Sequence, residues 1–242
     1  MKTAWMKIDL MKTTGMKTDL MKKDQIKRQE WKMMTVKEFQ VGMVGTNCFL
    51  AVNSETGEML VIDPGDNADV IADYVSKKEL HPKAVLLTHG HFDHCMAAQQ
   101  LAEQYQVPVY VHEDDKETME NPAYNCSGMI GRNLVFHADT FFHGEEDHLS
   151  LAGFEIEVYH TPGHTPGGVC FYIKSEGILF SGDTLFCESV GRTDFPKGSM
   201  SQLVRSINDR LFPLPDDTQV LPGHGEWTTI GTERRYNPFL QA

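Results

Sequence analysis

The chain has 242 residues, of which 40% are hydrophobic and 23% are charged, and its formal net charge is −12. This length can bury the core of one large domain or two small ones, and no stretch approaches the roughly 18 apolar residues of a membrane span. Because the chain has no such stretch, we expect no membrane partner. Its acidity repels phosphate backbones, so we also expect no nucleic-acid partner.

Cysteine usage indicates the redox environment. The five cysteines form no CxxC pair, their number is odd, and no secretory apolar segment opens the chain. These features favour a reducing, cytoplasmic location in which the thiols act as small buried hydrophobes. The cysteines are Cys48, Cys95, Cys126, Cys170 and Cys187.

The N-terminal segment differs in composition from the rest of the chain. Residues 1–34 hold nine basic and four acidic side chains, a net charge of +5, so the remainder carries −17. The segment repeats pentads that begin with Met-Lys, and five residues turn a helix by about 140°, which produces no apolar stripe. We expect residues 1–33 to be a disordered tail or a translated upstream region whose true start is Met33 or Met34, and residues 34–242 to form the folded domain.

Short apolar runs and helical patterns alternate in the first part of this domain. The order of the predicted elements is β-β-β-α-β-α-β, which is typical of a layered α/β fold. A cap at Asp66 or Asn67 is expected to begin the first helix. The predicted strands are residues 35–41, 47–53, 57–62, 83–88 and 107–112, and the predicted helices are residues 66–80 and 94–105.

The second part of the domain also alternates predicted strands and helices. Strands are predicted at residues 154–161, 168–175, 177–183 and 218–224, with a helix over residues 199–212. Two strand-rich halves with helices outside predict two sheets packed face to face between helical layers. Residues 113–144 are interpreted as surface structure near a site.

The stretch "THGHFDH", residues 88–94, concentrates side chains that bind metals. His89 and His91 are two apart in an extended segment, so their side chains project to the same side and can hold one ion. Asp93 and His94 lie at the turn into a helix, which directs them towards a neighbouring ion. The alternative is a chance cluster of solvated histidines.

Three further polar residues follow apolar strands. They are His164, Asp183 and His224, each at the carboxyl end of a strand, where α/β folds gather their ligands. Each alone could be a turn residue or a strand-end cap. Together with the first four they supply two sites of three ligands and one bridging carboxylate. We therefore expect two divalent ions, zinc first, with iron or manganese as alternatives.

Other candidate residues are less distinctive. Asp63 could orient a ligand or simply end a strand. No ligand role is assigned to the remaining histidines, which are His81, His112, His137, His143, His148 and His160.

Five blocks of this sequence resemble the metallo-β-lactamase superfamily, in its glyoxalase II-like (hydroxyacylglutathione hydrolase) branch: "THGHFDH", "TPGHTPGG", "SGDTLF", "GRTDFP" and "LPGHGEWTTIGTERRYNPF". The resemblance implies an αββα four-layer sandwich. It also implies one metal ion held by His89, His91 and His164, and a second held by Asp93, His94 and His224. Asp183 would bridge the two ions, and Asp93 and Asp183 are the candidate catalytic carboxylates.

The same resemblance implies a thioester substrate, possibly derived from glutathione. Thiols are good leaving groups, so no strong general acid is required, and no Ser-His or Cys-His nucleophile signature is present. Eighteen residues follow His224, as in the short bacterial members, whereas longer glyoxalase II enzymes add a helical domain that helps to hold glutathione. Arg192, with Lys197 nearby, could contact a substrate carboxylate or form a surface ion pair.

Three other functions remain open. A persulfide dioxygenase would bind a single iron through His89, His164 and Asp183, and would share the "GRTDF" block. A phosphodiesterase or nuclease is disfavoured by the charge of −17. A metal-binding module without catalysis would not need an open site for two ions.

Overall fold

The computed structural model describes residues 33–144 and 146–240, and one folded unit begins at Met34. The expectation for residues 1–33 therefore lies outside the described residues, apart from Met33.

Two six-stranded sheets form the centre of this unit. The first has the order β1-β2-β3-β4-β5-β6, and the second has the order β14-β13-β10-β9-β8-β7. The strands of the first sheet are β1 (Met34–Val41), β2 (Thr46–Asn53), β3 (Glu58–Ile62), β4 (His81–Leu86), β5 (Val109–His112) and β6 (Thr140–Phe142). Those of the second are β7 (Glu146–Leu151), β8 (Phe154–His160), β9 (Val169–Ile173), β10 (Ile178–Gly182), β13 (Gln219–Pro222) and β14 (Thr228–Thr229). A small hairpin joins β11 (Leu185–Phe186) to β12 (Ser189–Val190).

Strand direction changes within each sheet. The pairs β3/β4, β4/β5 and β5/β6 are parallel, as is β10/β13, and the other pairs are antiparallel. Helices lie outside the sheets, and all but the last of them belong to the crossover connections that the parallel pairs need. They are α2 (Ala68–Lys77), α3 (Phe92–Cys95), α4 (Ala98–Tyr105), α5 (Lys116–Glu120), α6 (Met200–Ser206) and α7 (Ile230–Tyr236), with 3₁₀ turns η1 (Glu113–Asp115) and η2 (Ser127–Ile130) and a π segment η3 (Ile207–Leu211).

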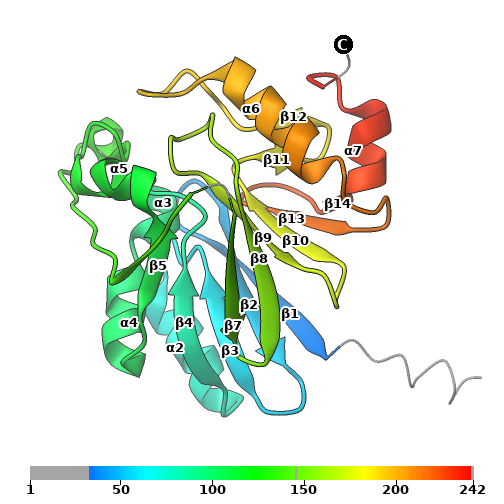
Figure 1. The fold of residues 1–242 in the computed structure, drawn as a ribbon. Coiled ribbons are helices and arrows are strands. Elements are labelled where there is room, and N and C mark those ends of the chain that lie inside the picture. The colour runs from blue at the N-terminus through cyan, green and yellow to red at the C-terminus, as the bar shows by residue number, and fades with distance from the viewer. Residues whose placement is uncertain (1–32, 145, 241–242) are drawn as a thin grey trace, which may run out of the picture. The chain divides into compact units, whose positions relative to one another are not determined.

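Alternating side chains of the central strands bury both faces of each sheet. On β2, Phe49 enters the core between the sheets, while its neighbour Leu50 packs towards α2 and α4. On β9, Phe171 enters the same inter-sheet core, and Tyr172 packs on the opposite side, near α6. The result is helix, sheet, sheet and helix in four layers (Figure 1). The predicted αββα sandwich is confirmed.

The predicted elements are largely present, with three local differences. The helix expected over residues 94–105 is divided into α3 and α4, and the one expected over residues 199–212 continues from α6 into η3. Asn67 precedes α2 in a left-handed conformation, but its side chain accepts a hydrogen bond from Gly42 N–H instead of capping the helix. Short edge elements were not predicted: β6, β7, β11, β12, β14 and α7.

Within the described part of the chain, no helix is long and apolar enough to cross a membrane. All five cysteines are free; four are buried, and Cys187 is exposed.

Candidate active site

The seven histidine and aspartate residues expected as ligands lie in loops that follow the carboxyl ends of four strands. His89 and His91 follow β4, and Asp93 and His94 lie on α3, the short helix that continues from the same loop. The other three, His164, Asp183 and His224, follow β8, β10 and β13. The packing of the two sheets brings these loops together, and we refer to the seven residues as the histidine–aspartate cluster.

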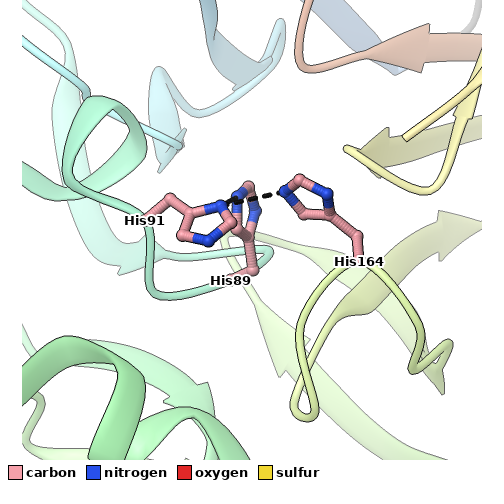
Figure 2. A group of neighbouring side chains, drawn as sticks. All are labelled: His89, His91 and His164. Atoms are coloured by element: carbon pink, nitrogen blue, oxygen red, sulfur yellow. Dashed lines mark hydrogen bonds between the residues drawn. The ribbon is translucent and has the colours of Figure 1, made fainter. Parts of the chain in front are cut away.

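One half of this cluster is a triad of imidazoles. The Nδ1 atom of His91 lies 3.0 Å from His89 Nε2 and 2.9 Å from His164 Nε2. Figure 2 shows the three rings converging from two separate loops. All three residues are buried. Burial first, and the neighbouring imidazoles second, lower the pKa of His89 and His91, so these rings are neutral and their lone pairs are free to bind a cation.

The other half combines carboxylates with imidazoles. Asp93, His94 and His224 place one ligand atom each within 4.8 Å of one another, and His224 Nε2 lies 3.3 Å from Asp93 Oδ2. Asp183 lies between the two halves. One of its oxygens is 3.4 Å from His164 Nε2, and the other is 3.4 Å from His94 Nε2.

Charge and hydrogen bonding both fit a cation at this place. Burial lowers the pKa of His94, yet three neighbouring carboxylates raise it to about 10. The Nε2 atom of His94 and the Oδ1 atom of Asp183 are buried without a hydrogen-bond partner among the described residues. Buried polar atoms are rarely left unpaired, and a metal ion would satisfy them. The donor set of imidazole and carboxylate suits zinc, iron or manganese.

Neighbouring residues orient the cluster. Asp63 accepts hydrogen bonds from the N–H and the hydroxyl of Thr88, both at 2.7 Å, and its Oδ2 lies 3.0 Å from His94 Nδ1. The φ of Asp63 is 50°, a strained conformation for a residue other than glycine. Both interpretations of Asp63 therefore hold, since it ends β3 and also faces a cluster histidine. Thr46 donates a 2.8 Å hydrogen bond to Asp93 Oδ2.

Asp115 joins the two loops that carry the imidazole triad. It is fully buried, and its carboxylate accepts hydrogen bonds from Gly90 N–H, Gly167 N–H and the Thr165 hydroxyl, each at 2.8 Å. Gly90 lies between His89 and His91, and the other two donors follow His164. Residues 113–144 were interpreted as surface structure; Asp115 shows that part of this segment is core. The acidic run "EDD" gave no sign of this contact.

Asn47 holds the loop of His224 in place, and Gly223 allows the backbone of that loop to pass close to the cluster. The side-chain amide of Asn47 donates hydrogen bonds of 3.0 Å to the carbonyls of Pro222 and Gly225. A Cβ atom on Gly223 would lie 2.3 Å from Asp183 Oδ1. Only glycine allows the backbone to pass this close to the cluster.

A pocket of about 380 Å³ opens over the cluster. Five apolar residues, none of them fully buried, form what we call the apolar wall. Cys126 also lines the pocket, and burial raises the pKa of its thiol to about 11, so it adds an uncharged surface. The wall residues are Val44, Met129, Ile130, Phe186 and Phe195.

The two residues proposed to contact substrate are engaged with carboxylates. Arg192 lines the pocket, but its guanidinium makes two hydrogen bonds to Asp194, of 2.9 and 2.8 Å, and lies 4.4 Å from the Phe195 ring centre. Lys197 pairs with Glu117 and is not among the residues that line the pocket. In this arrangement neither cation is free to bind a substrate anion.

A second group of histidines lies outside the pocket. The rings of His112 and His160 stack at 4.0 Å with an angle of 9° between their planes, and Asp114 is near both. The Nε2 atoms bond to the carbonyls of Gly144 and Pro166, so they carry protons. Parallel rings cannot both aim a lone pair at one ion midway between them, which agrees with assigning these histidines no ligand role.

Comparison with known proteins identifies the family. The model of the metallo-beta-lactamase superfamily matches residues 41–224. The chain is 38% identical to the hydroxyacylglutathione hydrolase GloC of Haemophilus influenzae over 211 residues, which cover 86% of this chain and 99% of GloC. The crystal structure of the B3 metallo-beta-lactamase BLEG-1 is 39% identical, with a TM-score of 0.82 over 86% of this chain and 100% of that one. The structure of TTHA1623 in a di-iron-bound form is 38% identical, with a TM-score of 0.74 over 84% and 100%.

The chain belongs to the metallo-beta-lactamase superfamily. The predicted family is therefore confirmed, and the protein is a metal-dependent hydrolase of that superfamily.

Proposed function

We propose that this protein is a binuclear hydrolase of thioesters, with S-lactoylglutathione as the reference substrate. The observation that carries the proposal is the pair of adjacent ligand triads with Asp183 between them. A dioxygenase that holds a single iron through His89, His164 and Asp183 would leave Asp93, His94 and His224 without a ligand role. The similarity to GloC, a hydroxyacylglutathione hydrolase, supports the thioester class.

In this proposal the cluster residues hold two divalent ions, zinc first, with iron or manganese as alternatives. The imidazole triad would hold one ion, Asp93, His94 and His224 would hold the other, and Asp183 would be a ligand within reach of both. Such ions, when bound, supply Lewis acidity and lower the pKa of a coordinated water towards about 7. The protein's own residues orient the ligands through Asp63 and Asp115 and line the pocket with apolar groups.

The test is release of free thiol from S-lactoylglutathione by the full chain loaded with zinc. His89→Ala serves as the inactive control, since it removes one ligand of the imidazole triad. We expect thiol release from the intact protein and none above background from the variant. Equal rates in both would refute the proposal. Oxygen consumption with glutathione persulfide by the iron-loaded chain, in place of thiol release, would indicate the dioxygenase.

A further inference from the structure

The side chains that line the pocket fall into two chemical groups. Five of them belong to the histidine–aspartate cluster, and the others are apolar or uncharged except for Arg192. That guanidinium already pairs with the carboxylate of Asp194 and packs on the ring of Phe195. Among the described residues that line the pocket outside the cluster, Arg192 is therefore the only charged one, and it is already paired with Asp194.

The apolar wall is open to solvent where it meets the mouth of the pocket. Met129 is 70% exposed and Val44 is 51% exposed, on the loops that contain η2 and the β1–β2 turn. Phe186 and Phe195 lie deeper and are half-buried. Apolar side chains gathered around a pocket mark a binding surface, and methionine adapts its shape to what it contacts.

The two halves of a glutathione thioester differ in what they could place against this wall. The glutathione half carries two carboxylates, an ammonium group and two peptide groups close to its sulfur. Burying these without partners is costly. An acyl chain carries only methylene and methyl groups beyond its carbonyl. Each buried methylene contributes about 0.8 kcal/mol of transfer free energy.

We infer that the apolar wall binds the acyl half of the substrate and that the enzyme prefers aliphatic acyl groups of medium length to small hydroxyacyl groups. This inference rests on the proposed thioester hydrolysis and specifies its substrate class. The thiol half extends to solvent across the mouth of the pocket. Its identity therefore affects the reaction less than the acyl group does.

The experiment measures kcat/KM of the zinc-loaded full chain on four thioesters: lactoyl and hexanoyl groups, each joined to glutathione or to N-acetylcysteamine. A methylene in an enclosed apolar pocket changes kcat/KM by about tenfold or more. Since this wall is partly open, we expect hexanoyl to exceed lactoyl by about tenfold with either thiol. Exchanging the thiol should change the rate by less than exchanging the acyl group.

Variants connect this preference to the wall. Met129→Ala should lower kcat/KM for the hexanoyl thioesters severalfold more than for the lactoyl thioesters, because the longer chain contacts more of the wall. Because Met129 is largely exposed, its truncation should not prevent folding. Met200→Ala is the matched control, since Met200 is 42% exposed, lies on α6 and does not line the pocket.

The outcomes separate this inference from the proposed function. Hydrolysis with lactoyl preferred, or with the thiol as the dominant determinant, overturns the inference alone. If Met129→Ala lowers kcat/KM equally for both acyl groups, the inference alone is likewise overturned. Failure of all four thioesters to exceed the His89→Ala background overturns the proposed function, and the inference with it.

Discussion

The histidine–aspartate cluster and the apolar wall face the same pocket but are built in opposite ways. The cluster histidines are mostly buried, and Asp63, Asp115 and Asn47 hold the loops on which the cluster lies. The wall consists of partly exposed side chains, and Met129 and Val44 at its mouth are largely solvent-accessible. Reaction chemistry needs fixed geometry, whereas substrate selection tolerates adaptable surfaces. Changes in the cluster should therefore affect the reaction itself, and changes in the wall should affect the choice of substrate.

Removing metal should have the largest effect. Chelation should abolish hydrolysis reversibly, because the cluster loses the ions that activate water and polarise the substrate carbonyl. The melting temperature should fall by about 5 to 10 °C, since ions bind the folded state in preference to the unfolded one. Activity and calorimetry before and after re-addition of zinc measure both effects. Full activity in the presence of a strong chelator would contradict a metal-dependent cluster.

Asp183→Ala should come next, with kcat/KM lowered about a thousandfold, since the metal site supplies several kcal/mol of transition-state stabilisation. Because Asp183 contacts both halves of the cluster, the variant should bind both ions weakly. His224→Ala is the comparison, and it should weaken chiefly the ion near Asp93. Metal content by mass spectrometry distinguishes the two. Retention of two tightly bound ions by the Asp183 variant would rule out a bridging role.

Asp115→Ala should lower activity and metal affinity by about 10- to 100-fold, the range found for residues that orient metal ligands. Two N–H groups and two hydroxyls would lose their acceptor, so the free energy of unfolding should fall by about 3 kcal/mol. Asp114→Ala is the matched control, since its side chain is 55% exposed. Metal titration and chemical denaturation measure the two effects. If Asp114→Ala and Asp115→Ala lower metal affinity and the free energy of unfolding equally, Asp115 does not orient the metal ligands.

The smallest effect is expected for Arg192→Ala, which should raise KM for S-lactoylglutathione by less than about threefold. Its guanidinium is paired with Asp194, and exposed ion pairs contribute little. Asp194→Ala releases the guanidinium and should lower KM if a substrate carboxylate can reach it. Steady-state kinetics of both variants measure this. A large rise in KM for Arg192→Ala would show that Arg192 exchanges Asp194 for substrate, which is one of the two interpretations that the sequence allows.

Much of this architecture could be predicted from local patterns. Continuous apolar runs in β2, β3 and β9 specify strands buried on both faces, because the side chains of a strand point alternately to its two sides. His89, His91, Asp93 and His94 are close in sequence, so their spacing alone indicates that they can act together. The edge elements β6, β7 and β14 are short or half-exposed and carry weaker patterns, which is why they were not predicted.

Only the tertiary structure decided which distant residues meet. Asp115 lies in an acidic run that resembles solvated surface, yet it is buried between the loops of His89 and His164. The apolar wall combines Val44, Met129 and Phe186 from three separate segments. Local sequence determines elements through short-range periodicity, but contacts between loops depend on how both sheets pack, and no local pattern encodes that.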